Sequence, residues 1–391
     1  MTPAAPPATR TAAIGLALLA TLATAAPPAR AQDSVLTEQD RTPRAKTLGI
    51  TGLLVGGALG YGFGATQKPP AYSIAVGAAL LGGLAGYFVG RQYDELHAAQ
   101  FHGVRPIAPR TSEAELEGDP TALAVHDDLI AVGGNEGVQL FSSGGGSLLP
   151  TGTRAGGLLG ISTVEITPRT GWLTIGAENG LYIFPPRRGR GVLVNPGSVA
   201  AVIATSGRIF SASGDRVIVT PVGADSAQPW PNTDLGAPVR ALAIDTARAI
   251  IWAATDKQLI ALQAIGDSLV RLGAAAIDGG ARRVTVQGDI AAVAVGERGV
   301  RIFDVSDPRR PLALKTWTVA RFAYDVSLDG KRMFVAAGPE GVYVADFHGK
   351  NLVTIGLARG LGFASAIVSR DGYTYLLDRR TNTLRRLASD F

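Results

Sequence analysis

The sequence predicts an all-β repeat domain that follows an α-helical membrane segment, and three observations support this prediction. Residues 1–31 have the composition of an export signal. Residues 47–91 contain two long uncharged stretches rich in glycine, and the rest of the chain repeats a strand pattern about every 41 residues. The 391-residue chain is 46% hydrophobic and has no Cys. That composition excludes intrinsic disorder, a disulfide framework and thiolate metal sites.

Residues 1–31 predict a secretory signal peptide that is cleaved after Ala31. They contain two arginines and no acid, residues 12–25 form an almost unbroken apolar run, and residues 29–31 fit the small-x-small cleavage pattern. The alternative is an uncleaved membrane anchor. Cleavage leaves 35 basic and 32 acidic side chains. A balance this close to neutral does not indicate a nucleic-acid partner, which would need a clustered basic face.

A polar linker at residues 32–46 leads into a predicted transmembrane hairpin at residues 47–91. The 21 residues between Lys46 and Lys68 carry no charge, and neither do the 22 residues between Lys68 and Arg91. As a helix, each stretch is long enough to cross a hydrocarbon core of about 30 Å. Two prolines directly after Lys68 cannot continue a helix, so they predict the turn between the two spans.

Small residues recur at every fourth position in both stretches, which leaves one face of each helix almost free of side chains. The positions are Gly52, Gly56, Gly60, Gly64, Ala78, Gly82, Gly86 and Gly90. In lipid, two such faces approach closely and pack by van der Waals contact. The pattern resembles the glycine-zipper two-helix segments of bacterial envelope proteins, which implies membrane helix packing and self-association. A soluble helical hairpin or a linker is the alternative, but each Gly disfavours a soluble helix by about 1 kcal/mol.

Residues 119–391 repeat a unit of several short strands. The third strand of each unit is expected to start at Val138, Leu181, Val217, Leu259, Val300, Val342 and Leu384, with spacings of 43, 36, 42, 41, 42 and 42 residues. A period near 41 with several strands per unit is typical of a β-propeller, so seven units predict a seven-bladed β-propeller. Residues 92–118 form a connector. The seventh unit lacks an outer strand, and we expect residues 103–109 to supply it and close the ring.

Two stretches of the repeat region are similar to known propeller repeats. Residues 299–308, with the sequence Gly-Val-Arg-Ile-Phe-Asp-Val-Ser-Asp-Pro, resemble the LVIVD-type repeat. Residues 327–336, Ser-Leu-Asp-Gly-Lys-Arg-Met-Phe-Val-Ala, resemble the YVTN-type repeat of extracytoplasmic propellers. The third, fourth and seventh units depart from both patterns. The resemblance implies a protein-binding or ligand-binding module more than an enzyme, although the fold alone does not decide function.

Four arginines stand where the innermost strands of the fourth to sixth units begin: Arg240, Arg282, Arg283 and Arg321. In a propeller these positions lie near the mouth of the central channel. Guanidinium groups that converge there would bind a carboxylate or phosphate, because Arg presents a planar, bidentate fork. The alternative is that these residues only cap strand ends at the surface.

Four units also place a glutamate in the turn between the second and third strands: Glu136, Glu178, Glu297 and Glu340. The turn glycine that follows each of them indicates a positive φ. These glutamates are expected on the same face as the arginines. There they would bind a cationic partner or, alternatively, serve as ordinary solvated turn residues.

The sequence contains no recognisable catalytic constellation. It has no nucleophile elbow and no phosphate-cradling loop in a strand–helix context, and its four histidines are scattered without a metal-ligand spacing. We therefore predict no enzymatic activity, no cofactor and no metal site.

The sequence as a whole predicts a membrane-anchored, extracytoplasmic (periplasmic) propeller that acts as a protein-interaction or ligand-binding scaffold in the cell envelope. Its expected partner is an envelope or membrane protein. One alternative is an extracytoplasmic hydrolase or lactonase with its site in the central channel. The other is a membrane oligomer that assembles through the glycine zipper.

Overall fold

The computed structural model divides the chain into two compact units, residues 1–100 and 101–391. In the first unit the structure describes only Thr51, Leu54, Val55, Ala58 and Ala85, all of them helical. In the second it describes residues 104–388 except 108–109, 145–146, 155–157 and 187–188. The predicted signal peptide, linker and zipper positions therefore lie outside the described residues. Within the described part, no helix is both long enough and apolar enough to span a membrane.

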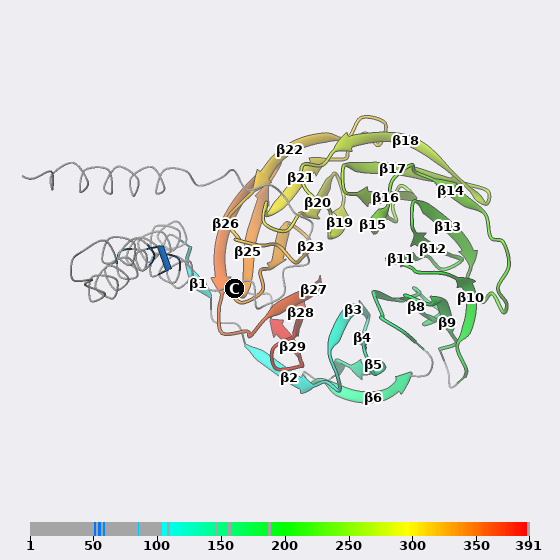
Figure 1. Cartoon of the computed structure of the whole chain (residues 1–391), viewed down its shortest axis with the longest axis horizontal. Helices are drawn as coiled ribbons and strands as arrows, with labels where there is room; N and C mark the ends of the chain where they lie inside the picture. Colours follow the sequence, from blue (N-terminus) through cyan, green and yellow to red (C-terminus); the bar gives the residue numbers. More distant parts are fainter. Residues whose placement is uncertain are drawn as a thin grey trace, which may run out of the picture. The chain divides into compact units, whose positions relative to one another are not determined.

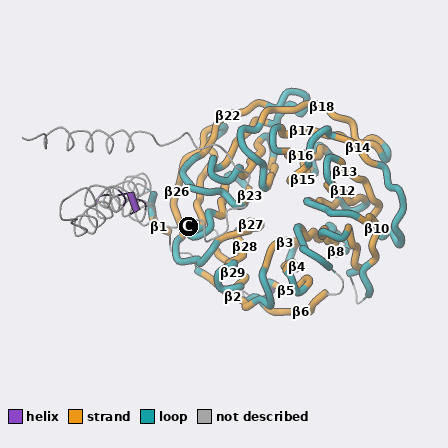
Figure 2. Tube along the Cα trace, in the orientation of Figure 1, coloured by secondary structure: helices purple, strands orange, loops and turns teal. Residues whose placement is uncertain are grey.

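The second unit is an all-β, seven-bladed β-propeller, as the repeat period predicts (Figure 1). Seven sheets surround a common axis. In five blades the strand that comes first in the chain is the innermost one, whereas in the other two the strand that comes first in the chain is the outermost (Figure 1). Figure 2 shows that the strands of each blade follow one another from the centre of the ring outward and are joined by turns. The predicted starts of the third strands agree with the structure to within one residue in all seven blades.

The first four blades are consecutive in sequence. The first blade contains β3 (Pro120–His126), β4 (Leu129–Gly134), β5 (Gly137–Ser142) and β6 (Leu149–Arg154). The second contains β7 (Thr163–Ile166), β8 (Leu173–Ala177), β9 (Gly180–Phe184) and β10 (Val192–Pro196). The third contains β11 (Ala201–Ala204), β12 (Arg208–Ser213), β13 (Arg216–Pro221) and β14 (Asn232–Asp234). The fourth contains β15 (Val239–Asp245), β16 (Ile250–Thr255), β17 (Gln258–Ile265) and β18 (Ser268–Ala276).

The last three blades include the two strands that come first in the chain. The fifth blade contains β19 (Arg283–Gln287), β20 (Ile290–Ala294), β21 (Val300–Asp304) and β22 (Leu312–Trp317). The sixth contains β23 (Asp325–Asp329), β24 (Arg332–Ala336), β25 (Val342–His348), β26 (Asn351–Ala358) and the short β1 (Pro106–Ile107). The seventh contains β27 (Ala364–Arg370), β28 (Tyr373–Asp378), β29 (Thr383–Ala388) and β2 (Thr111–Glu115).

The ring is closed by β2, which pairs antiparallel with β29 (Figure 1). The chain's N-terminal side thus supplies the missing outer strand, but from residues 111–115 and not from 103–109. Pro106 and Ile107, which lie within the expected segment, instead pair in parallel with β26 of the sixth blade. The sequence Thr-Ser-Glu-Ala-Glu gives little strand signal because an outer strand is largely solvated, and its residues alternate between exposed and half-buried.

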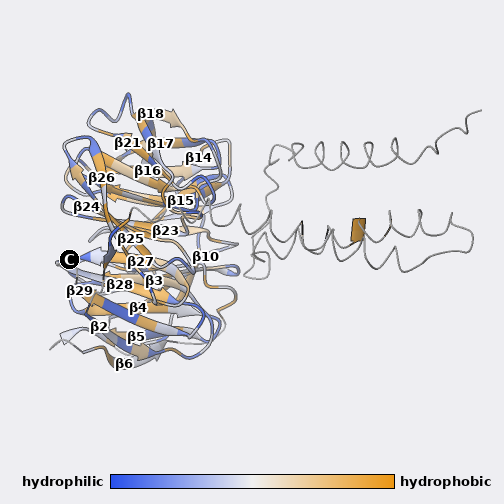
Figure 3. Cartoon of the chain, turned by 90° about the vertical axis from the view of Figure 1, so that its left-hand side faces the viewer, coloured by the Kyte–Doolittle hydropathy of each residue, from blue (hydrophilic) through white to orange (hydrophobic). Residues whose placement is uncertain are grey.

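The core lies between the blades. The described residues form seven hydrophobic clusters, and each cluster joins two neighbouring blades, including the seventh and the first. Figure 3 shows apolar colouring along the strands and hydrophilic colouring mainly at the turns. Large, fully buried side chains such as Trp252, Phe210 and Phe334 fill these interfaces. Every blade is therefore held by both of its neighbours, which makes the ring a rigid support for residues at its faces.

The two faces of the propeller are defined by the direction of the innermost strands. We call the face where β3, β7, β11, β15, β19, β23 and β27 begin the leading face, and the face where they end the trailing face. Because successive strands of a blade are antiparallel, the turns between second and third strands also lie on the leading face. The predicted arginines and turn glutamates consequently lie on the leading face.

Candidate functional site

Two of the four leading-face arginines already have acidic partners. Arg240 contacts the carboxylate of Asp256 through two nitrogens, with an Nη2–Oδ2 distance of 2.9 Å. The Nε of Arg321 lies 3.4 Å from Oε1 of Glu340. Both arginine side chains are about half exposed. Ion pairs this exposed contribute little to stability, and their charges are largely cancelled for an incoming anion.

Arg282 has an aromatic neighbour instead of an acid. Its guanidinium carbon lies 4.7 Å from the centroid of the Phe322 ring, a cation–π arrangement. Phe322 is the first of three aromatic rings in contact. The Phe322 and Tyr324 rings are tilted, with centroids 4.4 Å apart, and the Tyr324 and Phe363 rings meet edge to face, with centroids 5.0 Å apart. Burial lowers the pKa of Arg282, Tyr324 acts in the opposite direction, and the nearby charge of Arg283 lowers the pKa further. This cation is therefore held in a partly desolvated position, where a counter-charge would be strongly attracted.

Arg283 crosses the axis of the ring. It is the first residue of β19 in the fifth blade, and its Nη2 donates a hydrogen bond of 3.3 Å to the carbonyl oxygen of Ser162, next to β7 in the second blade. These two blades are not neighbours, so the side chain must extend across the centre (Figure 1). None of the described acids lies within ion-pair distance of Arg283, which leaves most of its donors for another acceptor.

Asp325 is the acid next to Arg283 on the axis. It is buried at the start of β23, and it accepts backbone hydrogen bonds from Val326 at 2.7 Å and from Ile367 of the seventh blade at 3.0 Å. Burial raises its pKa to about 6, although the Arg283 charge and the two N–H groups act in the opposite direction. This side chain links two blades and remains mostly ionised at neutral pH.

Glu165, in the middle of β7, also faces the axis. It interacts electrostatically with Arg370, which lies on the seventh blade, beyond the intervening first blade. Protein surrounds the carboxyl, although the residue as a whole is only partly buried. Burial raises its pKa to about 8, and the Arg370 charge only partly offsets this effect. Glu165 has no hydrogen-bond or ion-pair partner among the described residues, so at neutral pH it is an unused O–H donor.

The axial cluster, defined as Glu165, Arg283, Asp325 and Arg370, carries net positive charge near pH 7. Two guanidinium groups face one ionised carboxylate and one neutral carboxylic acid. Arg283 marks the leading end of the axis and Arg370 the trailing end, because they are the first and last residues of their strands. With Arg282 beside Arg283, the leading end is suited to a carboxylate or phosphate group.

The turn glutamates have mainly local contacts. The Glu136 side chain lies over Gly118, and the Glu178 side chain lies over Gly160; a Cβ on either glycine would come within 2.7 Å of the glutamate. These two glycines have positive φ and belong to the loops that enter the first and second blades. The two glutamates thus cover inter-blade loops and do not converge on one point.

Glu340 and Glu297 differ from each other. The Oε2 of Glu340 accepts hydrogen bonds from the Tyr343 hydroxyl at 3.1 Å and from the backbone N–H of Arg321 at 3.3 Å. Glu297 is exposed. The glycines after the four turn glutamates have positive φ, as predicted: Gly137, Gly180, Gly299 and Gly341. Among the described residues, no group of three or more His, Asp or Glu side chains is arranged to hold a metal ion.

Arg282 and Arg283 were predicted from the sequence as site residues, whereas Glu165 and Asp325 were not. Glu165 is the one acid in its innermost strand, which is otherwise mostly apolar, and this isolated charge was a signal in the sequence. Asp325 shares its strand with a second acid, Asp329, so it gave no such signal. Neither a scan against protein-family models nor a search of curated proteins finds a match to this chain. The LVIVD-type and YVTN-type resemblances therefore remain predictions, and the site has to be interpreted from its own geometry.

Proposed function

We propose that this protein is a membrane-tethered, extracytoplasmic scaffold whose propeller binds an anionic group of a partner at the leading end of the axis. The observation that carries the proposal is Arg283, which extends across the axis and has no acid within ion-pair distance among the described residues. Arg282 lies next to it and stacks on Phe322. Two adjacent cations in a partly desolvated setting attract a carboxylate or phosphate far more than paired surface arginines do.

The tether and the location rest on the sequence. An export signal followed by two uncharged, glycine-rich stretches favours a hairpin in an envelope membrane, with the propeller outside the cytoplasm. The described residues Leu54 and Val55 are helical and exposed, which suits a helix whose apolar side chains contact lipid. An envelope or membrane protein is the partner that such a tether would bring close to the leading face.

The zipper provides a separate test of the tether. Gly56→Leu together with Gly82→Leu would add bulk to both packing faces and should abolish oligomers in detergent while leaving the propeller folded. Unchanged oligomer size, measured by light scattering, would contradict self-association through this hairpin. Ala58→Leu is the matched control, because Ala58 lies outside the four-residue spacing.

The scaffold proposal is tested by purification of the tagged full chain after gentle solubilisation, with mass spectrometry of everything that co-elutes. We expect one stoichiometric envelope protein, with crosslinks that map to the leading face around Arg282. Recovery of the chain alone, or crosslinks confined to the trailing face, would contradict the proposal. Recovery in the soluble fraction without any membrane step would contradict the tether.

A second function, that of an extracytoplasmic hydrolase, is favoured by one observation. Glu165 and Asp325 both face the axis with pKa values raised to about 8 and about 6, and acid–base catalysis near neutral pH uses carboxyls with such values. A screen of ester and lactone substrates tests this function. Turnover that Glu165→Gln abolishes would establish it, whereas turnover that survives both Glu165→Gln and Asp325→Asn would exclude these carboxyls.

A further inference from the structure

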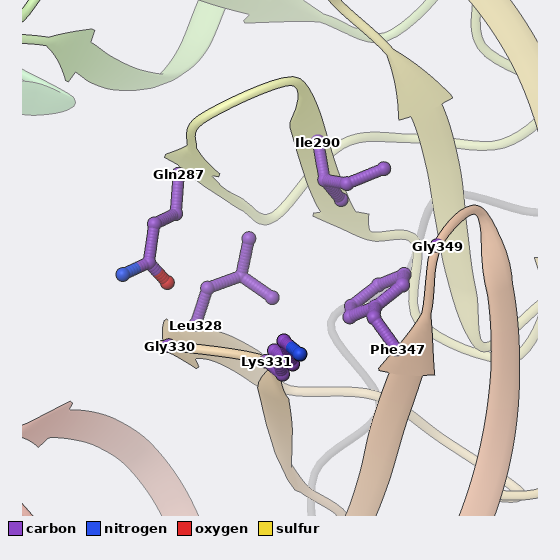
Figure 4. Close-up of a pocket in the computed structure, with 7 residues that line it drawn as sticks. All are labelled: Gln287, Ile290, Leu328, Gly330, Lys331, Phe347 and Gly349. Carbon is purple, nitrogen blue, oxygen red and sulfur yellow. The ribbon is translucent and has the colours of Figure 1, made fainter.

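A pocket on the trailing face lies between the fifth and sixth blades (Figure 4). Its volume is about 200 Å³. The apolar side chains of Ile290, Leu328 and Phe347 point toward a common space, and Gln287 and Lys331 stand at its rim. The site is distinct from the axial cluster, because it is formed by the turns at the opposite ends of the strands.

The equivalent position at the preceding interface, between the fourth and fifth blades, is filled by Arg248. Its Nη1 donates to the carbonyl oxygens of Val305 at 2.9 Å and Ser306 at 3.1 Å, and its Nη2 donates to that of Gly288. The strand registers make Gly288 equivalent to Gly330 and Val305 equivalent to Phe347. Arg248 thus occupies, one blade earlier, the place that is open in the pocket.

Turn length explains why the fifth blade has no such side chain. The turn between β15 and β16 contains the four residues 246–249, and this length lets Arg248 reach across to the next blade. The turn between β19 and β20 contains only Gly288 and Asp289. A two-residue turn that starts with Gly supplies no side chain able to cover the sixth blade, so the apolar walls stay uncovered.

The charged residues around the pocket also differ from those around Arg248. Arg248 forms ion pairs with two carboxylates, those of Asp245 and Asp289. In the pocket, the register-equivalent residues are Gln287 and Lys331. Compared with the site of Arg248, the pocket therefore has neither acid and has one additional cation, Lys331. Lys331 forms no ion pair with any residue in the described ranges. The pocket disfavours a second arginine and favours an apolar group that carries a negative charge.

We propose that this pocket binds the carboxy-terminal residue of a partner polypeptide, with its aliphatic or aromatic side chain between Leu328 and Phe347 and its carboxylate beside Lys331. The volume accommodates one such side chain. In a carboxy-terminal residue the charge lies one bond from the Cα, close to the mouth that the side chain enters, and Lys331 stands at this mouth. The inference does not depend on the function proposed for the leading face.

The proposal is tested with N-acetyl-leucine as the probe, titrated into the purified full chain and followed by ligand-detected NMR. N-acetyl-leucinamide, which lacks the negative charge, serves as the matched ligand. We expect the acid to bind at least fivefold more tightly than the amide. The preference should disappear in Lys331→Gln and persist in Lys257→Gln, a variant of an exposed lysine on the leading face.

A second variant tests the pocket by blocking it and not by removing the charge of Lys331. Gln287 is exposed at the rim, so Gln287→Trp should block the pocket without disturbing the core, and it should abolish binding of the acid. Equal binding of acid and amide, or binding that survives Gln287→Trp, would overturn the proposal. Tighter binding of octanoate than of N-acetyl-leucine would also overturn it, in favour of a fatty acid.

Discussion

The two faces of the propeller use arginine in different ways. On the trailing face, Arg248 bonds to carbonyl oxygens of the next blade, and Arg370 donates to the Val125 carbonyl oxygen at 3.2 Å. On the leading face, Arg282 lies over an aromatic ring and Arg283 reaches one carbonyl across the axis. The acceptors around a guanidinium group thus decide whether it holds blades together or remains available to a ligand.

The largest expected effect is on the trailing face, from Arg248→Met. The change removes the bonds to three carbonyl oxygens and leaves the buried Asp245 carboxylate without its ion-pair partner. Loss of one partner of a buried pair costs about 3 kcal/mol, so the free energy of unfolding should fall by about that amount in a urea titration. A loss below about 1 kcal/mol would show that Arg248 does not hold the blades together.

The pH dependence of stability tests whether the carboxyl of Glu165 is buried and protonated. Burial raises the pKa of Glu165 from 4.5 to about 8, so between these values the folded chain keeps a proton that the unfolded chain has released. Stability should therefore decrease as pH rises from about 4.5 to 8, by at most about 1.4 kcal/mol per pH unit. Glu165→Gln should flatten this slope in unfolding titrations at pH 5, 6, 7 and 8. An identical slope in both proteins would contradict the buried, protonated state.

A smaller effect on stability is expected from Arg283→Gln. The substitution removes one 3.3 Å hydrogen bond across the axis, and such a bond contributes about 1 kcal/mol. The variant should also raise the pKa of Asp325 further, because it loses the positive charge that lowers that pKa. The measurement is the Asp325 carboxyl shift in an NMR titration. A pKa that stays near 6 would mean that the two side chains do not interact.

The smallest effect is expected from Arg240→Gln. Its ion pair with Asp256 is about half exposed, and such pairs contribute roughly 0–1 kcal/mol. The free energy of unfolding should fall by less than about 1 kcal/mol. Adding 1 M NaCl should change the free energy of unfolding of the wild-type protein by little more than that. A loss comparable to that of Arg248→Met would remove the distinction between the two faces.

The fold was largely predictable because strand patterns repeat locally in the chain. The positions of Val138, Val300 and the equivalent residues place all seven third strands to within one residue. The closing strand was located too early, since β2 is polar and pairs with residues more than 260 positions away. The helical hairpin remains a prediction from its glycine spacing.

The site was predictable only in part. The sequence places Arg282 and Arg283 at a strand start, but it does not reveal that Arg283 reaches Ser162, 121 residues away. It also does not reveal which arginines are neutralised, since the pairing of Arg240 with Asp256 depends on the antiparallel register of β15 and β16. Contacts between blades depend on how the blades are arranged in the ring, and the sequence of a single repeat does not show this arrangement.

The proposed binding depends on Arg282 and Arg283, which have no acid within ion-pair distance among the described residues, and not on Arg240 and Arg321, which form ion pairs. The most direct test measures the recovery of any envelope protein that co-purifies with the full chain. It compares the double variants Arg282→Gln/Arg283→Gln and Arg240→Gln/Arg321→Gln, both checked for wild-type circular dichroism. We expect at least a tenfold loss of recovery for the first variant and recovery within twofold of wild type for the second. Equal recovery by both variants, or greater loss in the second, would contradict the proposed binding.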